Sequence, residues 1–294
     1  MPSAPPTLPC RFVLVGAGRV GTSVAKLLTR SGGEPIAVWS RSARSAGRAA
    51  ALISAPVCAD IRFLPRADLI LVGTTEGAIR TVVDELAPRL EPGEAVVHFA
   101  GSLGLRPLEG AARAGAAVFA LHPVQACPDV PTALRRLPGS AWGVTCADPH
   151  RPWAHHLVSG HLKGVPVDVA EGDRPIWHAA SVTTANGISA LLAAAERMLR
   201  AVGVADPPAV LSPLAAGAAA NAAEGGGGGA TLTGPLVRGE LETIERHLDA
   251  LRAADPGLAE TYVDVARVIL GSALRESRID PAAADSMLSR LERS

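Results

Sequence analysis

The sequence has no excess charge of either sign, since its 28 Lys and Arg residues balance its 28 Asp and Glu residues. A basic surface that would bind nucleic acid or an acidic membrane is therefore not expected. The sequence also lacks a run of about 20 apolar residues, which a transmembrane helix needs. The N-terminal segment MPSAPPTLPC has neither the basic nor the apolar part of a secretory signal. We therefore expect a cytoplasmic protein.

Cysteine is scarce, and the four cysteines form neither a CxxC pair nor a zinc-ligand spacing. Their scatter in a chain of 294 residues fits reduced thiols and predicts no metal site. Hydrophobic residues, by contrast, make up 48% of the chain, and many of them are alanine. A chain of this length can bury roughly 75% of its unfolded surface, so one large domain or two ordinary domains are expected.

Three glycines stand between an apolar run and a helical pattern in residues 11–31, RFVLVGAGRVGTSVAKLLTRS. The run at 12–15 predicts a buried parallel strand, and strand, GxGxxG and helix in this order form the dinucleotide-binding fingerprint. In that fingerprint Gly16 makes the turn, Gly18 lets the backbone approach a pyrophosphate, and Gly21 lets the helix pack on the strand. The alternative is a tight turn without a ligand. The predicted cofactor contacts are Gly16, Ala17, Gly18, Arg19, Val20 and Gly21.

The end of the second predicted strand, residues 36–39, indicates which dinucleotide binds. NAD enzymes usually place Asp or Glu there, to bind the ribose 2′-hydroxyl. Here Ser40, Arg41 and Ser42 follow the strand. A hydroxyl and a guanidinium suit a 2′-phosphate, which a carboxylate would repel. The sequence therefore predicts NADP(H), and the alternative is a solvated arginine in a loop.

Apolar runs at 67–72, 95–99 and 118–121, with shorter ones at 142–146 and 165–169, continue the strand pattern, and 79–86 is helical. This pattern predicts an α/β fold, with a Rossmann dinucleotide-binding domain over residues 8–172 followed by an all-α C-terminal domain. Ligands of such sheets lie beyond the carboxyl ends of the strands. We therefore assign Thr74, Thr75 and Ser102 to the cofactor, and His98 and His122 to the substrate.

Strand patterns stop after residue 172, and residues 173–294 read as helices at 173–202, 209–223, 258–276 and 281–293. On the first of these helices, a core stripe is predicted from Ile188, Leu191, Ala195 and Met198. A second stripe carries His178 and Asn186, which could face a cleft or make a helix–helix contact.

Residues 232–248, LTGPLVRGELETIERHL, follow five consecutive glycines and are predicted to form one helix, with Pro235 in its first turn. An apolar stripe leaves several polar side chains beside it, where they need a partner or a ligand. The candidates for binding substrate are Thr231, Thr233, Arg238 and Glu240. The alternative is an exposed helix with capping threonines.

Five segments together resemble a bacterial family, and the resemblance covers nearly the whole chain. They are VLVGAGRVG, VVHFAGSLG, LHPVQ, WHAASVTTAN and LTGPLVRGELETIERHL. That family joins a Rossmann-like domain to a helical domain of formerly unknown function and includes alternative ketopantoate reductases. This chain departs from the family at Trp177, usually Tyr, at Thr75-Glu76, usually Pro-Asp, and at Ala100, usually Ser.

The architecture also resembles the superfamily of 6-phosphogluconate dehydrogenase, ketopantoate reductase and pyrroline-carboxylate reductase. Its Lys-x-x-x-Asn pair is matched here only by Asn186, because Val182 occupies the lysine position. The resemblance implies that His178 and Asn186 polarise the substrate, since histidine can supply a proton near neutral pH. It implies an NADPH-dependent oxidoreductase of the CH-OH type, reducing a small 2-oxo acid with ketopantoate preferred, and a homodimer. The alternatives are a reductase of a cyclic imine or another carbonyl acid, and a non-catalytic NADP(H)-binding regulator.

Overall fold

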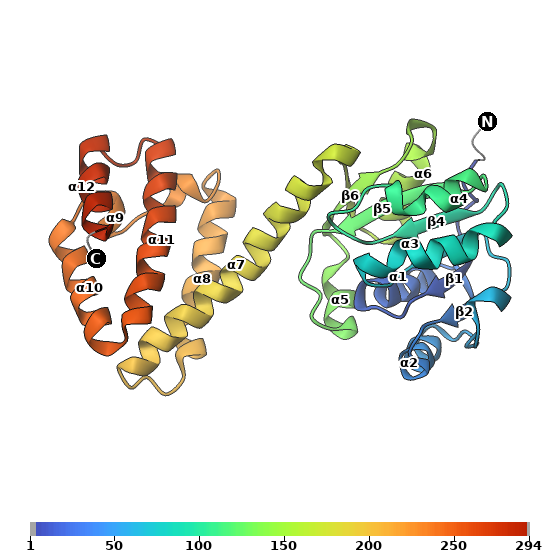
Figure 1. Cartoon of the computed structure of the whole chain (residues 1–294), viewed down its shortest axis with the longest axis horizontal. Helices are drawn as coiled ribbons and strands as arrows, with labels where there is room; N and C mark the ends of the chain where they lie inside the picture. The colour runs from blue at the N-terminus through green and yellow to red at the C-terminus, as the bar shows by residue number, and fades with distance from the viewer. Residues whose placement is uncertain (1–3, 293–294) are drawn as a thin grey trace. The chain divides into compact units, whose positions relative to one another are not determined.

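The computed structural model describes residues 4–292, whose contacts divide into two units (Figure 1). The first unit ends at Ala185 and the second begins at Asn186. This division falls inside a single helix, α7 (Arg174–Ala201). The domain boundary predicted from sequence, between residues 172 and 173, lies just before the start of that helix.

The first unit contains a seven-stranded sheet in the order β2-β1-β3-β4-β5-β6-β7. Neighbouring strands are parallel except β5 and β6, which are antiparallel. The predicted Rossmann-type α/β fold is thereby confirmed, with strand ends shifted by a few residues. The strands are β1 (Arg11–Val15), β2 (Glu34–Trp39), β3 (Leu69–Val72), β4 (Ala95–His98), β5 (Ala117–Pro123), β6 (Ala141–Thr145) and β7 (Val165–Asp168).

Both faces of this sheet are covered, as parallel sheets require. Alternate residues of β1 enter different cores: Phe12 and Leu14 belong to one, and Val13 and Val15 to the other. Four helices contribute to the first core, namely α1 (Arg19–Arg30), α2 (Ala43–Ile53), α5 (Val130–Arg136) and α6 (Arg151–His156). Two contribute to the second, α3 (Glu76–Leu86) and α4 (Glu109–Arg113). The sequence pattern alone does not predict α2, α4, α5 and α6.

The fingerprint glycines pack against a fourth glycine, Gly73, which directly follows β3. The Gly18 amide donates to the Gly73 carbonyl at 3.0 Å. A Cβ on Gly18 would lie 2.3 Å from that oxygen, and a Cβ on Gly21 would lie 2.6 Å from the Gly73 Cα. Gly16 has a φ of +91°, a conformation that favours glycine. The space left by Gly18 is therefore filled by the protein's own backbone, which modifies the role expected from the motif.

Replacing Gly73 with alanine is expected to destabilise the first unit by about 1–3 kcal/mol, as overpacking does. The new Cβ would lie 2.5 Å from the Gly16 carbonyl oxygen and 3.0 Å from the Gly21 Cα. All four tryptophans of the chain precede residue 178, so tryptophan fluorescence during denaturant unfolding reports on this unit.

The matched control is Gly77→Ala in α3, where a Cβ would have no neighbour within 4 Å. This variant is expected to keep or slightly raise stability, by up to about 1 kcal/mol, since alanine is the better helix former. Equal stability of the two variants would contradict the packing role of Gly73.

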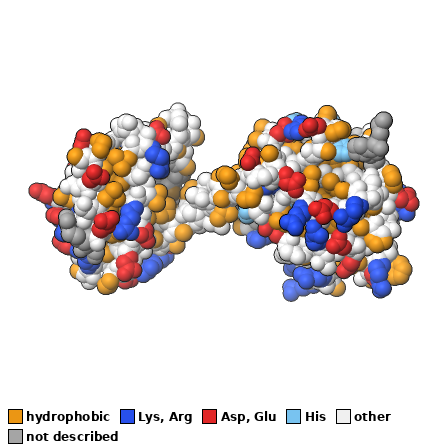
Figure 2. All heavy atoms as spheres, turned by 45° about the horizontal axis from the view of Figure 1, so that its top comes forward, with side chains coloured by type: hydrophobic (Ala, Val, Ile, Leu, Met, Phe, Trp, Pro, Cys, Tyr) orange, Lys and Arg blue, Asp and Glu red, His pale blue; other side chains and the backbone are white. Residues whose placement is uncertain are grey.

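The second unit is helical, as the sequence predicts. Besides the remainder of α7 it contains α8 (Pro207–Glu224), α9 (Pro235–Arg238), α10 (Leu241–Ala254), α11 (Pro256–Arg275) and α12 (Pro281–Glu292). Its buried core comes from α9 to α12 and includes Ile244, Leu248, Leu270 and Met287. No described helix has the length and apolar character needed to cross a membrane. On the face shown in Figure 2, basic and acidic side chains are interspersed over both units.

Two predictions about these helices are wrong. Residues 232–248 do not form one helix, because Gly239 adopts a φ of +73° and ends α9 before α10 begins. The predicted core stripe of α7 is not buried either, since Ile188 and Leu191 are 44% and 49% exposed. Among the described residues, the core of the second unit does not include α7. The apolar residues that recur along α7 therefore form an exposed face of the helix.

Candidate active site

The glycine loop lies where the strand order reverses between β1 and β3, the position at which open α/β sheets bind ligands. The helix α1 begins after Gly18 without a side-chain cap and without an acidic residue in its first turn. Its free amides and positive end therefore suit a phosphate. Thr74 lies against Gly16, and Thr75 occupies the N-cap position of α3 without a side-chain capping bond. Their placement beside the loop is compatible with the predicted cofactor contacts.

The residues after β2 also fit a phosphate. The Gly16 amide donates to the Trp39 carbonyl at 2.7 Å, which holds the end of β2 against the glycine loop. Ser40 is therefore adjacent to that loop. Arg41 is exposed, Ser42 caps α2 by accepting from the Ser45 amide, and the first turn of α2 contains no acidic residue. These groups would attract a 2′-phosphate and offer no carboxylate to a 2′-hydroxyl.

Three other residues of the motif are already engaged by the protein itself. Ala17 and Val20 pack against the first core. The Arg19 guanidinium donates to the Pro128 carbonyl at 3.0 Å, in the loop between β5 and α5. Any contact of these residues with a cofactor is therefore expected to come from their backbone.

A buried arginine that the sequence did not single out anchors the start of α7. Arg174 is 0% exposed and donates to the carbonyls of Ala100, Ala120 and Gly143. Burial lowers the pKa of Arg174 to about 10, which leaves it charged at neutral pH. The one sequence signal is its position, because a cation in the first turn of a helix opposes the helix dipole.

His98 is completely buried and has no ring nitrogen left for a substrate. Its Nε2 donates to the Gly104 carbonyl at 2.8 Å, and its Nδ1 accepts from the Ala100 amide at 3.1 Å. Burial, opposed in part by the bond to Gly104, lowers the pKa of His98 to about 4. The prediction that His98 binds the substrate is therefore wrong. Its ring instead stabilises the loop after β4 through these two hydrogen bonds.

That depressed pKa predicts a loss of stability in acid. An unfolded chain binds the His98 proton near pH 6.5 and the folded chain only near pH 4. The stabilisation is complete above pH 6.5 and is lost as the pH falls towards 4, by about 3 kcal/mol. Denaturant titrations followed by tryptophan fluorescence should show this slope, reduced in His98→Gln. An equal slope in both proteins would contradict the prediction.

The imidazole rings of His122 and His178 both lie against Gly101. The rings of His122 and His178 are perpendicular, with centroids 5.4 Å apart. A Cβ on Gly101 would lie 2.3 Å from His178 Cδ2 and 2.9 Å from His122 Nε2. Trp177 donates from its indole nitrogen to His122 Nδ1 at 3.1 Å. Neither Gly101 nor Trp177 was among the predicted site residues; only the motifs around them suggested a site.

Carboxylates lie at the same edge of the sheet. The Ser102 hydroxyl is 3.1 Å from both oxygens of Glu76, so this predicted cofactor contact is engaged by a neighbouring side chain. Glu171 accepts from the amides of Leu105 and Arg106 at 2.9 and 3.2 Å. The loop after β4 is thus held by His98 on one side and by two acids on the other.

The remaining predicted residues belong to the second unit. Asn186 is exposed on α7, and Thr233 is exposed before α9. The Thr231 hydroxyl donates to the carbonyls of Gly227 and Gly228. Arg238 and Glu240 pair across the break at Gly239 at 2.5 Å. Their joint role with His178 in one site stays a prediction.

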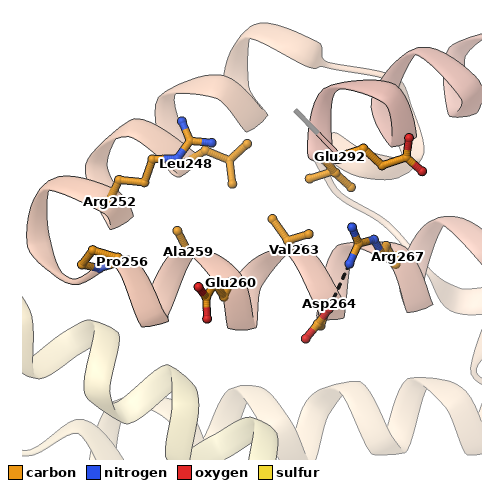
Figure 3. Close-up of a pocket in the computed structure, with 10 residues that line it drawn as sticks. Leu248, Arg252, Pro256, Ala259, Glu260, Val263, Asp264, Arg267 and Glu292 are labelled. Atoms are coloured by element: carbon orange, nitrogen blue, oxygen red, sulfur yellow. Dashed lines mark hydrogen bonds and ion pairs between the residues drawn. The ribbon is translucent and has the colours of Figure 1, made fainter. Parts of the chain in front are cut away.

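A pocket of about 620 Å³ opens within the second unit, between α10, α11 and the end of α12 (Figure 3). Apolar side chains, among them Leu248, Ala259 and Val263, alternate there with charged ones such as Arg252 and Glu260. None of the predicted site residues lines it. Residues 4–292 contain no cluster of three or more side chains suited to a metal ion.

Two family models match separate parts of the chain, and the second match begins inside the first unit. Residues 7–123 match the model of a Rossmann-like domain, and residues 140–269 match a domain of unknown function, DUF2520. No curated protein sequence matches the chain.

Solved structures share the fold over most of the chain. A Bacteroides fragilis protein described as an NADP oxidoreductase is 24% identical, covering 88% of this chain and 97% of its own, with a TM-score of 0.74. A reductive aminase from Aspergillus terreus is 19% identical, over 96% and 99%, with a TM-score of 0.63. A pyrroline-5-carboxylate reductase from Coxiella burnetii is 17% identical, over 97% and 98%, with a TM-score of 0.58. These likenesses establish the fold.

Proposed function

We propose that the protein is an NADP(H)-dependent oxidoreductase that reduces the C=O or C=N bond of a small organic acid. One observation carries this proposal. The glycine loop and the imidazole pair of His122 and His178 lie at the same edge of one sheet, where the parallel strands end. The groups after β2 suit a 2′-phosphate, and the Aspergillus terreus reductive aminase was solved with NADPH. The Bacteroides fragilis protein, described as an NADP oxidoreductase, also supports it.

When bound, the cofactor supplies a hydride to the substrate carbon. The protein has to supply a proton to the oxygen or nitrogen and to hold the substrate in place. His178 is half-buried, and none of the described residues hydrogen-bonds to its ring nitrogens. We assign the proton to His178. Reduction of a carbonyl then yields an alcohol and NADP⁺, with hydride and proton both accounted for.

The preferred substrate class is a 2-oxo acid, with ketopantoate the specific candidate from the sequence resemblance. A second candidate, an imine, is favoured by one observation. The carboxylates of Glu76 and Glu171 lie near Arg174 and the loop after β4, where they would attract a protonated C=N group. Pyrroline-5-carboxylate reductase, one of the similar folds, is by its name a reductase of this kind.

The decisive experiment measures NADPH oxidation with a panel of 2-oxo acids and cyclic imines, with NADH run in parallel. Turnover of an oxo acid with NADPH supports the leading proposal, and turnover of imines alone supports the second candidate. Binding of NADPH without turnover of any compound would indicate a non-catalytic regulator. No binding of NADPH would remove the proposal altogether.

We further propose a homodimer formed through α7 and α8. The α8 helix has no charged residue before Glu224, and a helix that is apolar on all sides is normally buried. Val210 and Leu214 on it are nevertheless 55% and 69% exposed. A second copy of the chain would cover this surface, and sedimentation of the full chain tests the proposal.

A further inference from the structure

We propose that His122 is a second catalytic residue, whose Nε2–H group donates a hydrogen bond to the oxygen or nitrogen being reduced. In this proposal Trp177 is a positioning residue that fixes the tautomer of His122. The inference rests on the proposed function, which assigns the proton itself to His178. The inference adds a hydrogen-bond donor, His122, next to the proton donor His178.

The tautomer follows from the chemistry of the indole group. Trp177 Nε1 lies 3.1 Å from His122 Nδ1. An indole nitrogen can only donate, so Nδ1 must be the unprotonated acceptor of the ring. A neutral imidazole carries one hydrogen, and in His122 this hydrogen therefore lies on Nε2.

The surroundings of the ring keep it neutral. Burial lowers the pKa of His122 to about 4, and the charge of Arg174 and the neighbouring rings of His178 and His98 act in the same direction. Two of these groups come from α7 and one from β4. At neutral pH His122 is thus a neutral ring whose single N–H group, at Nε2, can donate a hydrogen bond.

The Nε2 atom is also the side of the ring that is open. Among residues 4–292, no hydrogen-bond partner of Nε2 is found, whereas Nδ1 is occupied by Trp177. Nε2 and the ring of His178 both lie against Gly101, where an added Cβ would be 2.9 Å from Nε2 and 2.3 Å from His178 Cδ2, so only glycine lets the two rings approach here. In the proposed complex a substrate atom in contact with both rings would meet the neutral donor of His122 and the proton of His178 together. A fixed donor at such a point stabilises developing negative charge.

Strand pairing explains why Trp177 reaches His122. Gly143 of β6 is the antiparallel partner of His122 on β5. The indole of Trp177 lies on Gly143, where a Cβ would be only 2.7 Å from its Nε1 and Cε2 atoms. Because Gly143 has no side chain, the indole can cross β6 and hydrogen-bond to the next strand.

The tautomer can be measured without any turnover, by long-range ¹H–¹⁵N correlation on the full chain labelled at histidine. We expect His122 to show an Nε2–H tautomer at pH 7 in the wild-type protein. Trp177→Phe keeps an aromatic ring on Gly143 and removes the indole donor, so this variant should give a mixture of tautomers. An Nδ1–H tautomer or an imidazolium in the wild type would overturn the proposal.

Kinetics test the catalytic role with the substrate found in the panel. His122→Leu should lower kcat by about 10²–10³, the loss seen when one such donor is removed. KM should change by much less. His122→Gln, which retains an N–H donor, should recover part of the loss, and Trp177→Phe should lie between His122→Leu and the wild type.

Unchanged NADPH affinity and an unchanged far-ultraviolet circular dichroism spectrum would show that these variants are folded. A His122→Leu protein with full kcat, or a His122→Gln protein as slow as His122→Leu, would overturn the donor role. Absence of any wild-type turnover would instead refute the proposed function and with it the donor role. The NMR measurement would still decide the tautomer separately.

Discussion

Replacing His178 with alanine is expected to lower kcat by about 10²–10⁴, the contribution of a positioned acid. The ring borders Gly101 and faces His122 across a centroid distance of 5.4 Å, so its loss removes the proton source and leaves the sheet intact. NADPH affinity should remain at the wild-type value, because the glycine loop and the end of β2 do not involve His178. Steady-state kinetics and a separate binding titration measure the two quantities.

The control for His178→Ala is His156→Ala. His156 is an exposed histidine of α6 whose ring contacts His161 with a centroid distance of 5.1 Å. Its replacement should leave kcat unchanged. If His178→Ala retained full kcat while His156→Ala behaved as wild type, His178 would lose its role as proton donor.

The second large effect is expected for the coenzyme preference. Replacing both Arg41 and Arg44 with alanine should weaken NADPH binding by about 10–100-fold for each charged hydrogen bond lost. Both side chains are exposed at the start of α2, whose first turn has no acidic residue. NADH, which lacks the 2′-phosphate, should bind as it does to the wild type. Fluorescence or calorimetric titration with both nucleotides measures the ratio.

Arg62→Ala provides a control that also removes an exposed arginine. Arg62 lies in the same unit, is exposed, and pairs with Asp60 at 2.6 Å. Its loss should leave the affinity for both nucleotides unchanged. If the Arg41 and Arg44 double variant lost the same affinity for NADPH and for NADH, these arginines would not bind the 2′-phosphate.

The sheet could be predicted from sequence because each buried parallel strand is a short apolar run ending in glycine or a polar residue. The glycine loop was also predictable, because its three glycines lie within six consecutive residues, directly after such a strand. Arg174 and Gly73 could not be predicted, because their partners are distant in the chain. Arg174, for example, bonds to Ala100, 74 residues away. Only the folded sheet brings such residues together.

Periodicity also misled where the backbone or the packing decided the outcome. The pattern around residue 239 is helical on both sides, yet Gly239 takes a left-handed conformation and separates two helices. The stripe containing Ile188 has the spacing of a core, but burial depends on a partner surface that sequence spacing does not supply. His98 lies at a strand end like His122, and only their hydrogen bonds distinguish a structural ring from an available one.

The bonds of Arg174 to three backbone carbonyls fix more than the start of a helix. Trp177 and His178 follow within about one turn, so the sheet determines their rotation about the helix axis. A shift of one residue along α7 would turn both side chains by about 100°. Insertions or deletions between positions 174 and 178 should consequently abolish the imidazole pair, even where the helix itself survives.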